Sequence, residues 1–251
     1  MAPPRVILLP GAVLPAAAAY SGLIEALDAR AEVLAKDLEL YAGDAISPSY
    51  RLDDEITGII AAADERGWDR LHLAGYSGGG AAALACTARE PDRVLSLALF
   101  EPAWAGRWDM SAAEQAARRA YEALADTPPE RFLSTFAPLN LAPGVQPPPP
   151  PPGEPPPWMA LRPAGIATLT REFATYELDR EALARFDRPV YYALGGLSNP
   201  DQYGEIAKRL ATVFPNFTLE TFEDRHHFDP PHRVESERLA ASLEALWAQA
   251  A

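Results

Sequence analysis

The segment Gly75-Tyr76-Ser77-Gly78-Gly79 constrains this chain more than any other. It follows the apolar run from Leu71 to Ala74 and precedes an alanine-rich stretch that ends near Glu90. A serine in a sharp turn between a strand and a helix adopts a sparsely populated backbone conformation, which crowds the residues two before and two after it. Gly75 and Gly79 remove that crowding because neither carries a Cβ. The segment therefore predicts a strand–turn–helix unit that presents the Ser77 hydroxyl.

A phosphate-binding turn is the alternative interpretation of these glycines. Such a loop has a lysine followed by serine or threonine after its last glycine. Here Gly80 is followed by alanines and no lysine is present. The pattern therefore favours a nucleophilic serine over a phosphate cradle.

Apolar segments of strand length alternate with helical patterns along most of the chain. Strands are expected at Arg5–Leu9, Val33–Leu38, Leu71–Ala74, Val94–Phe100, Val190–Leu194 and Phe217–Phe222. Apolar strands separated by amphipathic helices are typical of a parallel sheet that is covered on both faces. We therefore expect an α/β fold with a mostly parallel sheet, whose core comprises residues 1–102 and 187–251.

Residues 103–186 interrupt this alternation. Helical patterns at Ala112–Leu124 and Ile166–Tyr176 flank a proline-rich stretch, 147–157. Proline sustains neither a helix nor a central strand, so this stretch is expected to be extended, like polyproline II. A docking site for an SH3-like partner is one interpretation; an irregular passage within an insertion is the one we favour.

Charge and cysteine content limit the possible partners and location. The net charge of −13 disfavours binding to nucleic acid or to anionic membranes. The single cysteine, Cys86, excludes an internal disulfide framework and predicts a cytoplasmic location. The apolar run after Arg5 is similar to a short signal peptide, but Pro10 and Gly11 interrupt it, and a strand followed by a loop explains it better. A small-molecule substrate is the expected partner.

With these elements in this order, the chain resembles the α/β-hydrolase superfamily over nearly its whole length. The resemblance implies that Ser77 is the nucleophile, that the Gly78 N–H is one oxyanion donor, and that 103–186 forms a cap. The second donor would come from Pro10-Gly11-Ala12, where the family often has His-Gly, with Ala12 the first choice and Val13 the second. Val13 and Tyr76 are also expected to contact substrate.

The same resemblance places the catalytic base after the last strand, in the segment from Asp224 to His232. Alignment on the family's histidine makes His227 the base, with His226 the alternative. A metal site is the other interpretation of three clustered histidines, but the segment lacks a helical His-x-x-x-His pair, so we expect no metal. His72, in the strand before Ser77, is expected to be structural.

The acid departs from the usual pattern. Family members carry it after the strand represented here by 190–194, where this chain has Ser198 and Asn199. A second location in the family is the end of the strand after the nucleophile helix, which here holds Glu101. A carboxylate that ends an apolar strand is poorly explained as a surface charge. We therefore choose Glu101 over Asp201; an ion pair with Arg107 is the structural alternative.

These assignments imply a carboxylesterase-like hydrolase with a Ser-His-Glu triad and no cofactor. The expected substrate is a small to medium, uncharged and largely apolar ester, lactone or thioester. Four cap residues are candidates to line its pocket, although packing within the cap would explain each equally well: Trp104, Trp108, Trp158 and Met159. The alternatives are a ligand-binding protein on a degenerate hydrolase scaffold, and an acyltransferase or C–C bond hydrolase with the same triad.

Overall fold

The computed structural model describes residues 3–149 and 152–250. Six strands form one sheet in the order β2-β1-β3-β4-β5-β6. Their bounds are β1 (Arg5–Leu9), β2 (Glu32–Ala35), β3 (Leu71–Tyr76), β4 (Val94–Phe100), β5 (Val190–Gly195) and β6 (Phe217–Phe222). All five neighbouring pairs are parallel, which confirms the predicted sheet and brings the carboxyl ends of the strands to one edge.

The second strand ends earlier than its sequence pattern predicts. The pattern extends to Leu38, whereas β2 stops at Ala35. Beyond it, the Asp37 carboxylate accepts a hydrogen bond of 2.7 Å from the Ala16 N–H, at the start of α1 (Ala16–Ala26). Asp37 thus lies beyond the end of β2 and binds the otherwise unpaired N-terminal turn of α1.

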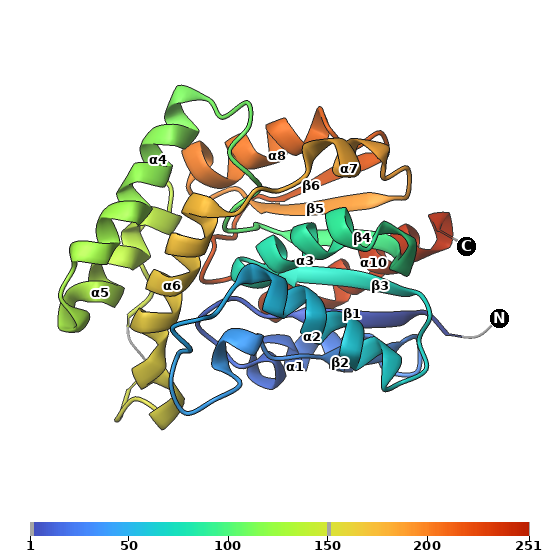
Figure 1. Cartoon of the computed structure of the whole chain (residues 1–251), viewed down its shortest axis with the longest axis horizontal. Coiled ribbons are helices and arrows are strands. Elements are labelled where there is room, and N and C mark those ends of the chain that lie inside the picture. The colour runs from blue at the N-terminus through green and yellow to red at the C-terminus, as the bar shows by residue number, and fades with distance from the viewer. Residues whose placement is uncertain (1–2, 150–151, 251) are drawn as a thin grey trace.

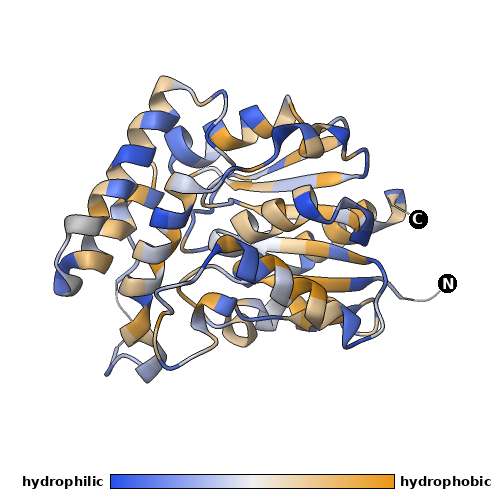
Figure 2. Ribbon diagram, viewed as in Figure 1, coloured by the Kyte–Doolittle hydropathy of each residue, from blue (hydrophilic) through white to orange (hydrophobic). Residues whose placement is uncertain are grey.

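Helices cover both faces of the sheet (Figure 1). One layer contains α1, α9 (Pro231–Val234) and α10 (Ser236–Gln249); the other contains α2 (Leu52–Asp64), α3 (Gly78–Arg89), α7 (Arg180–Arg185) and α8 (Glu205–Ala211). In β1, Val6 and Leu8 pack into the first layer and Ile7 and Leu9 into the second, and all four are fully buried. Burial on both faces explains why the sequences of the inner strands β1, β3, β4 and β5 are mostly apolar (Figure 2).

The segment between β4 and β5 contributes α4 (Ala112–Glu122), α5 (Pro129–Phe136) and α6 (Arg162–Thr175), which lie beyond the carboxyl ends of the strands (Figure 1). α7 also falls within 103–186 but packs against α3. Part of the proline-rich stretch 147–157, residues 150 and 151, lies outside the described residues. Where it is described, Pro156 has polyproline-like angles (φ −62°, ψ 150°).

Short helical turns complete the chain. They are η1 (Glu39–Tyr41), η2 (Pro91–Arg93), η3 (Ala123–Asp126), η4 (Ala137–Asn140), η5 (Pro157–Leu161) and the π-helical η6 (Pro200–Gly204). Over the described residues, none of the helices has both the length and the apolar character that a membrane span requires.

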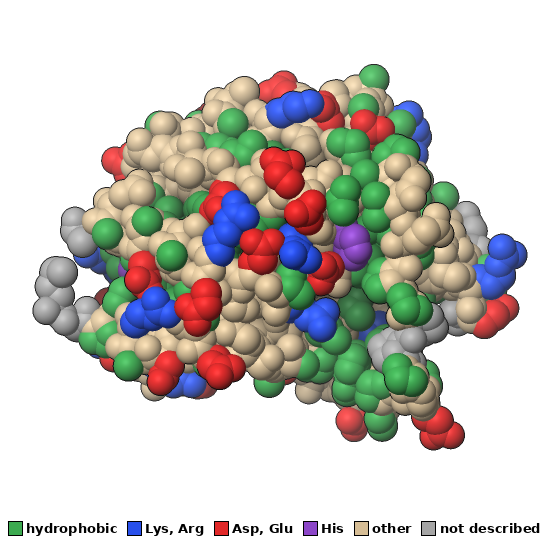
Figure 3. All heavy atoms as spheres, turned by 180° about the vertical axis from the view of Figure 1, so that it is seen from behind, with side chains coloured by type: hydrophobic (Ala, Val, Ile, Leu, Met, Phe, Trp, Pro, Cys, Tyr) green, Lys and Arg blue, Asp and Glu red, His purple; other side chains and the backbone are tan. Residues whose placement is uncertain are grey.

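Two further features concern the surface and the core. On the face formed by α1 and α10, acidic and basic side chains alternate (Figure 3). Arg238 pairs there with Glu220 and Glu235, and Arg30 pairs with Glu244. On the opposite side of the sheet, Cys86 is fully buried within α3, and burial raises the pKa of its thiol to about 12.

Candidate active site

The turn between β3 and α3 holds Ser77 in a strained conformation, with φ 52° and ψ −115°. The two flanking glycines are required sterically. A Cβ on Gly75 would lie 2.3 Å from the Gly79 carbonyl oxygen, and a Cβ on Gly79 would lie 2.4 Å from the Pro10 carbonyl oxygen. Only glycine at both positions allows β3, α3 and the loop after β1 to approach so closely.

His227 lies in the loop between β6 and α9 and is almost fully buried. Its Nε2 is 3.1 Å from Ser77 Oγ. Two tyrosines hold the residue: the Tyr76 hydroxyl donates to the His227 carbonyl oxygen, and the Tyr203 ring stacks on the imidazole with ring centroids 4.4 Å apart. The imidazole is therefore fixed against Ser77 by contacts on its backbone and on its ring face.

Glu101 follows β4 directly and has a positive φ of 47°. Its Oε2 is 2.9 Å from His227 Nδ1, and its Oε1 accepts a 2.8 Å hydrogen bond from the Gly195 N–H. The side chain is buried. With the proton on Nδ1 donated to Glu101, His227 Nε2 is free to accept the Ser77 hydroxyl proton.

The other acid candidate lies elsewhere. Asp201 is exposed, and its backbone N–H donates to the side chain of Asn199. Asn199 in turn donates from Nδ2 to the Leu139 carbonyl oxygen at 2.7 Å. Arg107 does not pair with Glu101 but donates to the Ala174 carbonyl oxygen and lies 3.9 Å from Glu122. Of the two carboxylates considered from the sequence, the structure brings Glu101 to His227.

The two backbone N–H groups predicted to be oxyanion donors, those of Gly78 and Ala12, lie at the turn that holds Ser77. Gly78 begins α3, where a backbone N–H has no carbonyl partner within the helix. The Ala12 nitrogen lies 3.6 Å from the place that a Cβ on Gly78 would occupy. Two hydrogen bonds hold the carbonyl groups of the loop after β1. The Gly79 N–H donates to the Pro10 carbonyl oxygen, and the Tyr41 hydroxyl donates to the Ala12 carbonyl oxygen. The loop after β1 is thus held in place at the turn.

The remaining histidines have other surroundings. His226 Nδ1 accepts the Phe228 N–H. His72 Nδ1 is 2.8 Å from Ser96 Oγ, and burial lowers its pKa to about 4. His232 is fully buried against Tyr20, Tyr76 and Phe100. Burial lowers the pKa of His232 to about 3. Both His72 and His232 are therefore uncharged at neutral pH. Over residues 3–149 and 152–250, no group of three or more His, Cys, Asp or Glu side chains is arranged to hold a metal ion.

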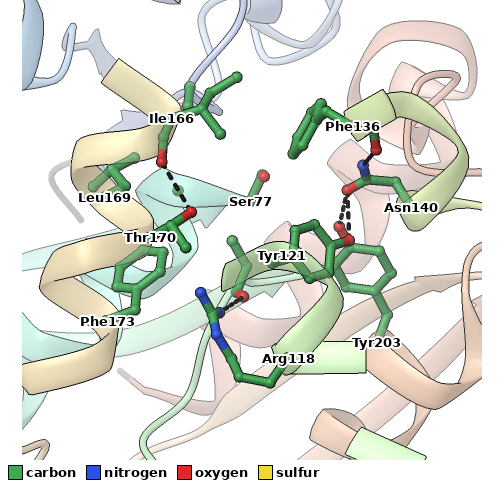
Figure 4. Close-up of a pocket in the computed structure, with 13 residues that line it drawn as sticks. Ser77, Arg118, Tyr121, Phe136, Asn140, Ile166, Leu169, Thr170, Phe173 and Tyr203 are labelled. Carbon is green, nitrogen blue, oxygen red and sulfur yellow. Dashed lines mark hydrogen bonds between the residues drawn. The ribbon is translucent and has the colours of Figure 1, made fainter. Parts of the chain in front are cut away.

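A narrow cavity of about 30 Å³ lies above Ser77 (Figure 4). Its walls come from the turn and from the helices between β4 and β5. The residues that line it are Ala12, Ser77, Gly78, Ala103, Arg118, Tyr121, Phe136, Asn140, Ile166, Leu169, Thr170, Phe173 and Tyr203. Apart from Arg118 and a few hydroxyl and amide groups, the lining is apolar.

The side chains predicted to bind substrate lie elsewhere. Within the described part of the chain, the cavity lining includes none of Val13, Tyr76, Trp104, Trp108, Trp158 and Met159. Trp104 is buried and stacks on Phe173, with ring centroids 5.3 Å apart. Trp108 lies beneath the Arg209 guanidinium, and Trp158 lies near that of Arg162. Trp104 and Trp158 thus pack against side chains of α6, and Trp108 packs against α8, so the aromatic side chains that reach the cavity are others.

The sequence analysis did not predict the aromatic and polar side chains that line the cavity, which are Arg118, Tyr121, Phe136, Asn140, Phe173 and Tyr203. Two of the hydroxyls, those of Tyr121 and Tyr203, donate to Asn140 Oδ1 at 3.0 and 2.6 Å. Tyr203 Oη is also 3.1 Å from His227 Nε2. Burial raises the pKa of Tyr203 well above its ordinary value, so it remains a neutral phenol. Its oxygen is then an acceptor for Nε2–H whenever His227 is protonated.

A family model described as the alpha/beta hydrolase family matches residues 6–241. The chain belongs to the alpha/beta hydrolase family. Membership in this family supports hydrolase activity. None of the curated proteins with which the chain was compared matches it.

Solved structures share this alpha/beta hydrolase fold at low identity. A thermophilic esterase from Thermogutta terrifontis is 18% identical over 98% of this chain and 90% of that chain, with a TM-score of 0.69. A carboxylesterase from Bacillus subtilis is 17% identical over 97% of this chain and 83% of that chain, with a TM-score of 0.66. A putative ancestral haloalkane dehalogenase is 20% identical over 99% of this chain and 92% of that chain, with a TM-score of 0.68. At such identities the similarity establishes the fold, and the chemistry has to be argued from the residues.

Proposed function

We propose that this alpha/beta hydrolase cleaves carboxylic esters, thioesters or lactones through an acyl-enzyme on Ser77. The observation that carries the proposal is the continuous contact from Ser77 Oγ to His227 Nε2 at 3.1 Å and from His227 Nδ1 to Glu101 at 2.9 Å. A serine hydroxyl is a weak nucleophile until a base takes its proton, and this contact provides the base and its orienting carboxylate.

In the proposed mechanism, Ser77 Oγ attacks the carbonyl carbon while its proton passes to His227 Nε2. The resulting imidazolium donates from Nδ1 to Glu101, whose negative charge stabilises it. The N–H groups of Gly78 and Ala12 bind the oxyanion; loss of one such donor costs about 10²–10³ in rate. His227 then gives its proton to the leaving oxygen or sulfur, the C–O or C–S bond breaks, and the acyl group remains on Ser77.

Water completes the cycle. His227 Nε2 takes a proton from a water molecule, whose oxygen attacks the acyl carbon, and the bond to Ser77 Oγ breaks as the serine regains its proton. Each of these steps uses a side chain that the turn, the β4 end or the β6–α9 loop holds in place. We propose that α4–α6 act as the cap, and that their largely apolar lining binds the acyl or alcohol chain of a small to medium substrate.

Fluorophosphonate labelling tests this proposal. We expect the wild-type protein to be labelled on Ser77 and to turn over a panel of p-nitrophenyl esters from acetate to octanoate. Ser77→Ala is the control and should lose both the label and the turnover. An unlabelled wild-type protein with no Ser77-dependent turnover would instead indicate a ligand-binding protein on a hydrolase scaffold.

A further inference from the structure

Two arginines are buried among the helices between β4 and β5 and the core beneath them, and their surroundings differ. Arg209 and Arg118 are each 6% exposed. Arg209 is saturated: Nε and Nη2 donate to the Glu114 carboxylate, and Nη1 donates to the Ala105 oxygen at 2.7 Å. A buried guanidinium with this many acceptors needs no further partner.

The Arg118 guanidinium, in contrast, has hydrogen-bond donors without acceptors. Within the described residues its one hydrogen bond is a long contact of 3.4 Å from Nη1 to the Ala103 oxygen. Its Nε has no hydrogen-bond partner, and the Glu122 carboxylate stands 3.8 Å away, too far for a hydrogen bond. The Tyr121 and Phe173 rings lie within 5.8 and 5.5 Å of the guanidinium carbon. Burial lowers the pKa of Arg118, yet a guanidinium remains charged at neutral pH, so a cation with unused donors faces a largely apolar space.

That space is the cavity above Ser77. Arg118 lines it together with Ser77, and among the lining residues of the described chain it is the one charged side chain. Figure 4 shows the Arg118 guanidinium at the edge of the cavity, between Tyr121 and Phe173. Ala103 contacts both residues, since its N–H donates to the Ser77 backbone carbonyl oxygen at 2.9 Å and its own carbonyl oxygen accepts from Arg118. The guanidinium and the Ser77 side chain therefore border the same cavity.

We propose that Arg118 binds a carboxylate on the substrate, so that the chain hydrolyses esters, thioesters or lactones that carry a carboxylate a few atoms from the scissile carbonyl. This inference rests on the proposed function and narrows it, because it replaces an uncharged substrate with an anionic one. Glu122 offsets part of the Arg118 charge at 3.8 Å without accepting a hydrogen bond. A buried guanidinium with unused donors costs free energy, and a substrate carboxylate that reaches these donors supplies the acceptors that the protein does not.

Matched esters test the inference. Monoethyl succinate, glutarate and adipate are compared with ethyl butanoate, pentanoate and hexanoate by pH-stat titration of the released acid. We expect the wild-type kcat/KM to favour one of the anionic esters by at least about tenfold over its neutral partner. Arg118→Gln should lower kcat/KM for that anionic ester about 100-fold, mainly through KM, and lower kcat/KM for the neutral ester far less. Arg118→Lys should fall between them, because a point charge lacks the planar fork.

Arg107→Gln is the matched control, since it removes the same charge from an exposed arginine beside Glu122. Its preference for anionic esters should be unchanged. A wild-type preference for the neutral esters, or an equal loss of both esters in Arg118→Gln, would overturn the inference.

Calorimetry separates this inference from the proposed function. Succinate, glutarate and adipate are titrated into Ser77→Ala, with Arg118 intact or replaced by Gln. We expect one diacid to bind at least about tenfold more weakly to the double variant. Ser77 labelling with turnover of neutral esters alone would refute the anionic preference and keep the hydrolase. Diacid binding through Arg118 without labelling of Ser77 would refute the hydrolase and keep the anion site. If no diacid binds saturably and no anionic ester is preferred, Arg118 has no role in ligand recognition.

Discussion

β4 and β5 are neighbours in the sheet, and both end at the edge where His227 lies. β4 ends on a side chain, because the Glu101 carboxylate reaches His227 directly. β5 ends on a backbone group, because the Gly195 N–H donates to that same carboxylate. The ends of two adjacent strands thus position one carboxylate: the residue after β4 supplies it, and the backbone N–H at the end of β5 orients it.

Because Glu101 provides the carboxylate, the loop after β5 makes other contacts. The Leu197 oxygen accepts the Ala142 N–H at 2.9 Å, and the Asn199 side chain donates to the Leu139 oxygen at 2.7 Å. Residues 197–199 therefore bind the insertion instead of His227. With the carboxylate on β4, the β5 loop holds the helices above the cavity in position.

The largest effect is expected from Glu101→Gln. The amide oxygen can still accept the Gly195 N–H, which turns the amide NH₂ toward His227 Nδ1. That contact requires Nδ1 to be an acceptor, so the proton moves to Nε2 and His227 can no longer take the Ser77 proton. We expect kcat to fall by about 10³–10⁴. Steady-state kinetics with a short-chain ester measures it, with Asp201→Asn as the control. Equal turnover by Glu101→Gln and wild type would place the acid elsewhere.

Gly195→Ala tests the β5 side of the comparison. A Cβ there would lie 2.6 Å from the Arg225 oxygen and 2.8 Å from Ser198 Oγ. The strand end must shift to relieve these contacts, which displaces the N–H that Glu101 accepts. We expect about 1–3 kcal/mol of lost stability together with a lower kcat, measured by urea unfolding and kinetics. An unchanged kcat at reduced stability would show that Gly195 is structural only.

A smaller effect is expected from His232→Phe. The His232 ring packs on Phe100, the last residue of β4. Its pKa in the folded chain is about 3, below its ordinary value of 6.5. Between these values the unfolded state binds a proton that the folded state excludes, so stability falls as the pH drops below 6.5. From pH 7 to pH 5 this amounts to about 2 kcal/mol. In His232→Phe the decline should be smaller by that amount, with the contribution of His72 retained. Urea unfolding at both pH values measures the difference, and identical pH dependence would contradict it.

The smallest effect is expected from Asn199→Ala, which removes one hydrogen bond between the β5 loop and the insertion. We expect about 1 kcal/mol of lost stability and little change in kcat, since Asn199 does not contact His227. The measurements are thermal unfolding and turnover of the same ester. A loss of kcat comparable to that of Glu101→Gln would mean that the β5 loop acts on the base after all.

Local patterns in the sequence are enough to predict the sheet and to select Ser77, and the resemblance to the α/β-hydrolase superfamily adds Glu101 and His227. The structure brings the three side chains within hydrogen-bonding distance. The physical reason is that each follows an element with a clear signature: a strand ended by two glycines, an apolar strand ended by a carboxylate, and a loop before the closing helix. Their distances depend on strand register and on the Tyr76 and Gly195 contacts, which no local pattern shows.

The cavity lining could not be predicted in the same way. Which side chains of 103–186 converge depends on the path of α4–α6, and the sequence does not specify how a proline-rich segment turns them. Tryptophans were expected at the cavity because they are large and apolar, yet Trp104 is buried behind Phe173. Arg118 carried a weak signal that was missed: it lies three residues before Tyr121 on one face of a helix, and both are buried.

Because Cys86 is buried, the rate at which its thiol is modified can be used to measure the opening of α3. The thiolate is the form that reacts with alkylating and disulfide reagents, and a buried thiol with a pKa of about 12 forms almost none of it. Modification of the native chain must therefore wait for α3, the helix that begins next to Ser77, to separate from the sheet. Because Cys86 is the sole cysteine, the rate of thiol modification in native buffer measures how often that helix opens, without any introduced label. The same rate measured with a bound inhibitor would show how strongly occupation of the cavity suppresses this opening.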